Sequence, residues 1–266
     1  MSRPPFALAN WKMAMTIEEG LAFLRTFLPL VEPWVGRMTI VLCPPATALA
    51  PMARALPPET VALGAQDCSA EADPAHTGQL SASLLADAGA RWVLLGHWEV
   101  RRQQGDDDAR VNRKLHRALE AGLRPILLVG EARDEAEEAP SALARSMARL
   151  LEGCTAEQVA TMAFVYEPEW TIGVAEPAPV AHVAAGADFL RNWLAARYGE
   201  AVAQAVPIIY GGSVTPEHAQ ALLAVPSVDG LGAGRKGRDP HAFARIVESV
   251  ARQRLAGGEG PPTTSA

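Results

Sequence analysis

Three ionisable residues that lie at the ends of short apolar runs could together move a proton. Glu167 ends one such run (161–167), His97 follows another (91–96), and Lys12 follows the first run of the chain. A carboxylate at the end of a buried strand loses hydration, which raises its pKa and makes it a usable general base near neutral pH. A histidine can hydrogen-bond a developing enolate oxygen or shuttle a proton, and a lysine supplies positive charge for an anion.

Two glycine-containing turns add a candidate anion site. Residues 211–213 are Gly-Gly-Ser, and residues 232–235 are Gly-Ala-Gly-Arg. Such turns expose backbone N–H groups, which suit a phosphate. A base, an electrophile and a phosphate site together indicate proton abstraction next to the carbonyl of a small sugar phosphate. Taken singly, each residue also fits a structural role: a surface lysine, a structural histidine, a loop glutamate or a tight turn.

The residues of this set are far apart in sequence, so the fold must bring them together. Most apolar runs of the chain are continuously hydrophobic rather than alternating, which is typical of parallel strands buried on both faces. The eight predicted strands are 5–10, 38–43, 61–66, 91–96, 124–130, 161–167, 206–211 and 228–234.

Helical patterns separate these runs. Thr16 begins a capping-box pattern before the first of them, and Gly122 is a C-cap signal after another. Thr215 and Asp239 each precede a proline in the first helical position. The predicted helical stretches are 17–30, 108–121, 131–151 and 177–198, with two more beginning after Thr215 and Asp239.

Eight strand–helix repeats over about 250 residues predict a single-domain α/β protein, a parallel eight-stranded (β/α)8 barrel of the TIM-barrel type. A doubly wound open sheet is the alternative, but it usually has a glycine-rich turn after its first strand, where this chain has Asn10-Trp11-Lys12-Met13. We therefore expect a barrel over residues 1–255 and a disordered tail over 256–266. Because catalytic groups of such barrels lie at the C-terminal ends of the strands, the candidate residues should converge there.

Composition excludes several classes of protein. Of the 266 residues 49% are apolar, the net charge is −6 and there is no basic block, so we expect no nucleic-acid partner. No apolar run approaches the ~18 residues of a membrane span, and the N-terminus shows no secretory signal. Cys43, Cys68 and Cys154 form no metal-binding pattern and are predicted to be free thiols in a cytoplasmic protein.

Five stretches, in order and at barrel spacing, resemble the triosephosphate isomerase family. The resemblance extends from about Ala7 to Val250. The stretches are Asn10-Trp11-Lys12-Met13, the loop 64–78, Gly96-His97 with Glu99, Tyr166-Glu167-Pro168 with Trp170, Ile172 and Gly173, and Tyr210-Gly211-Gly212-Ser213-Val214.

The resemblance implies a role for each residue and an interconversion of dihydroxyacetone phosphate and glyceraldehyde 3-phosphate through an enediolate. Glu167 would be the base and His97 a neutral electrophile, with a lid beginning at Pro168; this family is itself the standard case of that arrangement. Lys12 and Asn10 would face the substrate, with Glu99 in support. No metal and no organic cofactor is implied.

Phosphate binding and assembly are implied in the same way. The phosphate would be held by backbone amides of Gly173, Ser213 and Gly234. The loop that contains Thr77 inserts into a neighbouring subunit in the family, so a homodimer is expected.

Four departures from the family pattern lie around the same site. Trp98 stands where the family usually has serine, Val100 replaces an arginine, and the lid 172–177 reads Ile-Gly-Val-Ala-Glu-Pro instead of Ile-Gly-Thr-Gly-Lys. Arg235 replaces a glycine and could either reach the phosphate or face solvent. Two alternatives therefore stay open: an isomerase of a four-carbon ketose phosphate (erythrulose phosphate), and a barrel that binds a phosphosugar without catalysis because Trp98 blocks the site.

Overall fold

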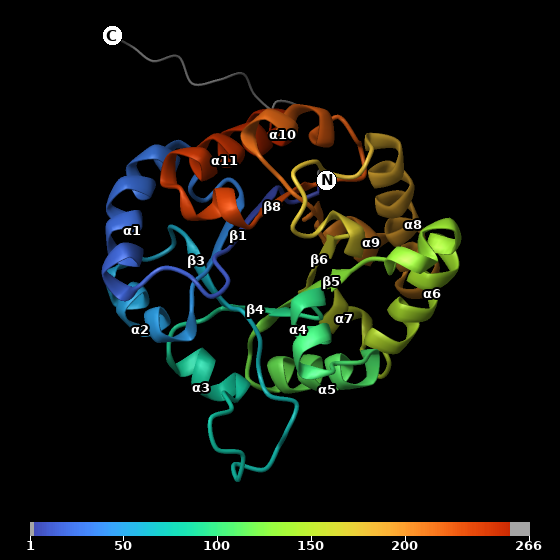
Figure 1. Cartoon of the computed structure of the whole chain (residues 1–266), viewed down its shortest axis with the longest axis horizontal. Helices are drawn as coiled ribbons and strands as arrows, with labels where there is room; N and C mark the ends of the chain where they lie inside the picture. Colours follow the sequence, from blue (N-terminus) through green and yellow to red (C-terminus); the bar gives the residue numbers. More distant parts are fainter. Residues whose placement is uncertain (1–2, 256–266) are drawn as a thin grey trace.

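Eight parallel strands close into a barrel in chain order, with β8 pairing to β1 (Figure 1). The computed structural model describes residues 3–255, so the predicted tail 256–266 lies outside the described residues. The closed barrel is confirmed and the open doubly wound sheet is wrong. The strands are β1 (Phe6–Asn10), β2 (Thr39–Cys43), β3 (Ala62–Ala65), β4 (Trp92–Leu95), β5 (Arg124–Val129), β6 (Ala163–Tyr166), β7 (Ile208–Tyr210) and β8 (Gly230–Ala233).

Helices form a ring outside the barrel (Figure 1). Within residues 3–255, no helix combines the length and the apolar character needed to cross a membrane. The α-helices are α1 (Ile17–Val31), α2 (Ala46–Ala55), α3 (Ala82–Asp87), α4 (Trp98–Gln104), α5 (Asp108–Glu120), α6 (Ala139–Leu150), α7 (Ala156–Val159), α8 (Val180–Tyr198), α9 (Glu200–Ala205), α10 (Pro216–Leu223) and α11 (Pro240–Leu255). Short 3-10 turns are η1 (Glu32–Trp34), η2 (Arg133–Glu138), η3 (Glu169–Thr171) and η4 (Arg235–Arg238).

The helix starts follow most of the predicted caps. Thr16 and Glu19 form the capping box of α1, and Asp239 accepts hydrogen bonds from the first backbone N–H groups of α11. Thr215 occupies the N-cap position of α10 but makes no side-chain capping bond there. The stretch 131–151 differs from its prediction, because it begins as the 3-10 turn η2 and becomes α-helical only at α6, which has a proline in its first turn.

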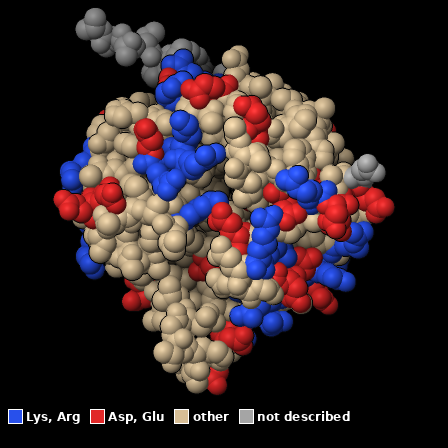
Figure 2. Space-filling model, viewed as in Figure 1, with Lys and Arg blue, Asp and Glu red and all other residues tan. Residues whose placement is uncertain are grey.

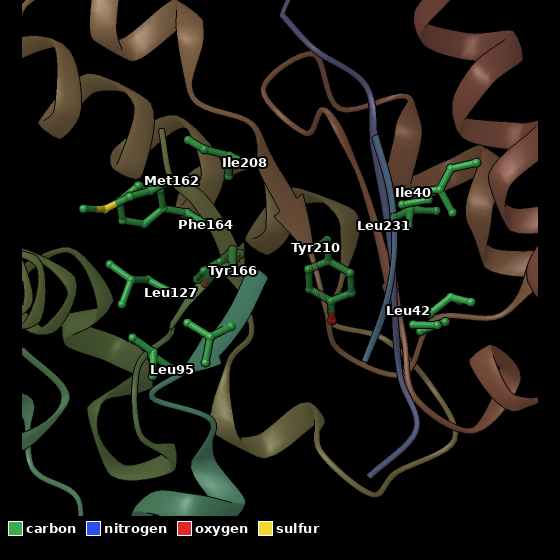
Figure 3. Close-up of a cluster of buried hydrophobic side chains, with 14 of the residues drawn as sticks. Ile40, Leu42, Leu95, Leu127, Met162, Phe164, Tyr166, Ile208, Tyr210 and Leu231 are labelled. Atoms are coloured by element: carbon green, nitrogen blue, oxygen red, sulfur yellow. The ribbon is translucent and has the colours of Figure 1, made fainter. Parts of the chain in front are cut away.

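The core has two layers, separated by the strands. Alternate strand residues point into the barrel or outward to the helices. In β6, Ala163 and Val165 belong to the inner cluster, whereas Phe164 and Tyr166 belong to the outer one, where Figure 3 shows them with other outward-facing side chains. The next position with inward parity is Glu167. The pleat that buries β6 on both faces therefore also directs the carboxylate into the mouth of the barrel.

Candidate active site

A pocket of about 730 Å³ lies at the C-terminal ends of the strands. Figure 2 shows a hollow at the centre of this face with Lys and Arg side chains along its rim. Inner-layer residues such as Leu94 and Val165 form part of its lining. The pocket brings together the predicted catalytic and phosphate residues, namely Asn10, Lys12, His97, Glu99, Glu167, Gly173, Ser213, Gly234 and Arg235. Thr77 is not among the lining residues; it lies exposed in the long loop between β3 and α3 (Figure 1).

Glu167 is a buried carboxylate with an incomplete set of partners. It is 7% exposed, and its backbone N–H donates to Val129 O at 2.9 Å, which continues the β5–β6 ladder. Within the described residues its Oε2 atom accepts no hydrogen bond. Burial raises the pKa of Glu167 to about 8, although the positive charge of Lys12 lowers it. A carboxyl group with such a pKa can take up and release a proton near neutral pH.

His97 faces this carboxylate with its Nε2 atom, 3.7 Å from Glu167 Oε2. The backbone N–H of Glu99 donates to His97 Nδ1 at 3.1 Å, so Nδ1 must be the unprotonated nitrogen of the ring. The single proton of the neutral imidazole therefore sits on Nε2, which faces the pocket. Burial, and then the charge of Lys12, lower the pKa of His97 well below its ordinary value. The ring is thus a neutral hydrogen-bond donor across the physiological range.

Lys12 is held in an unusual backbone conformation. Its φ is +55°, a region that residues other than glycine rarely adopt. Two side chains stabilise this turn: Asn10 Oδ1 accepts from the Lys12 N–H at 3.0 Å, and Gln66 Nε2 donates to the Lys12 carbonyl at 2.9 Å. The Lys12 Nζ atom lies 2.6 Å from Glu99 Oε1. Gln66 was not predicted, although it ends the predicted strand 61–66, where functional residues of a barrel are expected.

The segment 168–178, which we call the lid, contributes Thr171, Ile172, Gly173 and Ala175 to the lining of the pocket. Ser213 Oγ is within hydrogen-bond distance of two lid carbonyls, Thr171 O at 2.9 Å and Val174 O at 2.7 Å. The Tyr210 hydroxyl accepts from the Ala178 N–H at 2.8 Å. Gly212 has no room for a side chain, because a Cβ atom there would lie 2.2 Å from Thr171 Oγ1. The lid is therefore closed against the loop after β7.

A second group of contacts holds the start of the lid. Glu131 is fully buried and accepts hydrogen bonds from Tyr166 OH at 3.1 Å and from Trp170 Nε1 at 3.3 Å. Its Oε1 atom also lies 2.7 Å from His182 Nε2. The sequence argument missed this cluster. The signal was available, since Glu131 directly follows the predicted strand 124–130 and is a charged residue at a buried position.

Trp98 does not block the site. Its indole Nε1 donates to the backbone carbonyl of Glu167 at 3.1 Å, and the ring is half-buried, with the Arg101 guanidinium 5.7 Å from its centre. Since His97 and Glu167 approach to 3.7 Å, no indole lies between them. The alternative in which Trp98 prevents catalysis assumed that the indole fills this space, and that assumption is wrong. Trp98 instead links the start of α4, whose N-cap is His97, to the backbone of Glu167.

We expect Trp98→Phe to lower kcat about 3- to 10-fold while the protein stays folded. The substitution keeps an aromatic ring but removes the N–H group, and one neutral hydrogen bond is worth about 0.5–1.5 kcal/mol. Trp193→Phe is the matched control, because Trp193 packs near Tyr198 on α8 and does not line the pocket. Steady-state kinetics and thermal unfolding of both variants test this. A kcat equal to that of the control would show that the indole N–H does not position Glu167.

Comparisons with known proteins agree with this geometry. The family model described as triosephosphate isomerase matches residues 5–250. A triosephosphate isomerase of Symbiobacterium thermophilum is 42% identical over 254 residues, which cover 95% of this chain and 99% of that protein. One from Chloroflexus aurantiacus is 40% identical over 248 residues, covering 92% and 98%. The crystal structure of triosephosphate isomerase from Bartonella henselae superposes with a TM-score of 0.81 at 32% identity, covering 92% of this chain and 98% of that one. With its barrel, its pocket and these relatives taken together, the chain belongs to the triosephosphate isomerase family.

Proposed function

We propose that this chain interconverts dihydroxyacetone phosphate and glyceraldehyde 3-phosphate. The observation that carries the proposal is the pair formed by Glu167 and His97, a buried carboxyl group of raised pKa 3.7 Å from the Nε2 atom of a neutral imidazole. A base and a hydrogen-bond donor at this separation can act on the carbon and the oxygen of one carbonyl-containing fragment.

The reaction is a proton transfer between adjacent carbons. The Glu167 carboxylate takes a proton from the carbon next to the carbonyl, and the electron pair of that C–H bond forms the enediolate. His97 donates a hydrogen bond from Nε2 to the oxygen on which negative charge develops. Protonated Glu167 then returns the proton to the neighbouring carbon, and the hydroxyl proton on the oxygen of the first carbon passes to the oxygen of the second, a transfer that His97 Nε2 can mediate. Atoms and electrons balance within the substrate, so the step itself consumes no oxidant or reductant.

The other end of the pocket suits the phosphate. Gly173, Ser213 and Gly234 place backbone around it, and Gly173 and Ser213 have φ values of +78° and +50°. Backbone N–H groups in such turns bind anions, and Lys12 supplies a full positive charge in the same pocket. We therefore assign the phosphate to these amides and the neutralisation of its charge to Lys12, with Asn10 holding the Lys12 backbone.

The relatives favour the three-carbon substrate. They are named for triose phosphates and match this chain over nearly its whole length. The non-catalytic reading loses its argument because Trp98 lies outside the space between His97 and Glu167. We also propose a cytoplasmic homodimer in which the loop around Thr77 contacts the second subunit; this loop projects away from the barrel in Figure 1. A molecular-mass measurement in solution tests the dimer.

A coupled assay of the purified protein tests the proposed reaction. We expect rapid turnover of glyceraldehyde 3-phosphate and slow or no turnover of the erythrulose phosphates, with Glu167→Gln as the inactive control. Turnover confined to the four-carbon compounds would make this a sugar-phosphate isomerase of different specificity. Absence of turnover with both, while inorganic phosphate still binds, would instead favour a binding protein.

A further inference from the structure

The carbonyl of Val174, in the middle of the lid, is the point where both phosphate loops meet. Ser213 Oγ, from the loop after β7, lies 2.7 Å from Val174 O. Arg235 Nη2, from the loop after β8, donates to the same oxygen at 3.1 Å. A carbonyl oxygen has two lone pairs and can accept both bonds. Arg235 was expected to reach the phosphate or to face solvent; it is exposed at the rim of the pocket, and its guanidinium also contacts the lid.

A second, separate contact holds the C-terminal arm of the lid. Glu176 Oε2 lies 3.3 Å from His218 Nε2, and the other ring nitrogen of His218 lies 3.2 Å from the Ser213 carbonyl. His218 belongs to α10, so this contact joins the lid to the helix that follows the β7 loop. Glu176 is 81% exposed, and an exposed pair of this kind contributes little by itself. Its importance is that it acts on the same segment as Arg235.

We propose that Arg235 is a lid-positioning residue, which fixes the closed lid to the β8 phosphate loop through the Val174 carbonyl, with Glu176 and His218 as a weaker second fastening. The structural part of this inference concerns the chain alone. Its kinetic consequence rests on the proposed function, because lid opening limits product release in many enzymes with closing loops.

Two physical roles for Arg235 have to be separated. A guanidinium at the rim of the pocket attracts a phosphate through its charge, and that attraction needs no contact with the lid. Lys236 provides the comparison, since it is the next residue, carries the same charge and lines the same pocket. Within residues 3–255, its side chain makes no hydrogen bond to the lid. Removal of either cation weakens phosphate attraction, but only removal of Arg235 releases the lid.

Hydrogen exchange of the lid, measured by millisecond labelling and mass spectrometry without any ligand, tests the proposal. We expect Arg235→Ala to accelerate exchange of the peptide 168–178 about 3- to 10-fold, the shift in a two-state opening that one lost hydrogen bond produces. Lys236→Ala should stay within about twofold of the unmodified protein, and Glu176→Gln should fall between the two. Peptides from the barrel strands should exchange equally in all variants. Equal lid exchange in Arg235→Ala and Lys236→Ala would overturn the proposal.

Kinetics provide a second readout. With triose phosphate, Arg235→Ala should raise KM several-fold while kcat stays the same or rises, because a lid that opens more readily releases both substrate and product faster. A fall in kcat with unchanged KM would contradict a lid-positioning role. If the unmodified protein turned over no triose phosphate, the proposed function would fail, yet the ligand-free exchange experiment would still decide whether Arg235 holds the lid.

Discussion

Replacement of Glu167 by glutamine is expected to abolish nearly all isomerase activity and, at alkaline pH, to make the folded chain more stable. The loss of activity follows from the loss of the base, since a positioned general base contributes about 10²- to 10⁴-fold. The amide keeps nearly the same shape, so the barrel and the closed lid should persist. Coupled assays at saturating and at low substrate measure the first effect, and a loss of only a fewfold would contradict the role of Glu167 as base.

The gain in stability follows from the sign of the pKa shift. Burial raises the pKa of Glu167 from 4.5 to about 8 in the folded chain. Between these values the folded chain binds more protons than the unfolded chain, so the free energy of unfolding falls as pH rises. Each pKa unit corresponds to about 1.4 kcal/mol, so the carboxylate destabilises the protein by roughly 3–5 kcal/mol above pH 8 and by almost nothing below pH 4.5. Glutamine removes this ionisation altogether.

Unfolding by urea at pH 5 and at pH 9 measures this difference. Glu167→Gln should exceed the unmodified protein in stability much more at pH 9 than at pH 5. Glu169→Gln is the control of opposite sign: burial raises the pKa of Glu169, but hydrogen bonds from Arg102 and from the Arg133 N–H outweigh it and lower the pKa. Loss of that carboxylate should cost nearly the same stability at pH 5 and at pH 9, since both lie above 4.5, and the cost should shrink only below pH 4.5. A Glu167→Gln advantage that does not change with pH would contradict the buried, raised-pKa base.

The destabilising effect of the Glu167 carboxylate explains why the contacts of the lid matter for the stability of the site. A carboxylate that destabilises the closed state needs compensating contacts nearby, and the lid supplies them through Tyr210, Ser213 and Arg235. Glu131 adds buried hydrogen bonds at the start of the lid. The site therefore keeps the Glu167 carboxyl group buried at the expense of local stability, a common conflict between function and stability.

The barrel and the position of the site could be predicted because both depend on short-range patterns. Strands buried on both faces are continuous apolar runs, and parallel strands of a barrel place their C-terminal residues at one mouth. That rule located Lys12, His97 and Glu167 without any knowledge of their contacts. It could equally have located Gln66 and Glu131, which end or follow predicted strands.

The directions of individual side chains could not be predicted in this way. Trp98 was considered as an obstruction, and Arg235 as a phosphate ligand or a solvent-facing residue. The structure places the indole N–H on the Glu167 carbonyl. Arg235 is exposed, as one of its alternatives had it, but its guanidinium also donates to the Val174 carbonyl. Both contacts join residues about 60 to 70 positions apart and end on backbone atoms, which carry no sequence signal. Residue type and strand periodicity specify a face of the barrel, whereas such contacts depend on the loops as they are packed.

Replacement of His97 by glutamine should lower kcat about 10²- to 10³-fold, the usual loss when one donor to a developing oxyanion is removed. The pH at which kcat/KM falls on the acid side should not change. That fall reports protonation of the base, because Glu167 must be ionised to accept a proton and its pKa is raised, whereas burial lowers the pKa of His97. His116→Gln is the matched control, since His116 on α5 contacts the Glu152 carbonyl and does not line the pocket.

Two measurements separate this assignment from one in which His97 itself titrates. The pH profiles of kcat/KM for the unmodified protein and for His97→Gln should run parallel, displaced vertically. Nitrogen NMR of the histidines should show His97 with its proton on Nε2 and none on Nδ1 from pH 6 to pH 9, as the hydrogen bond from the Glu99 N–H requires. Two results would assign the essential ionisation to the histidine instead of to Glu167. One is a fall of kcat/KM at low pH that disappears in His97→Gln. The other is an imidazole that gains a second proton near pH 6.5. Parallel profiles, with a single proton on the His97 ring, would instead show that ionisation of the Glu167 carboxyl group alone prepares the site for proton abstraction.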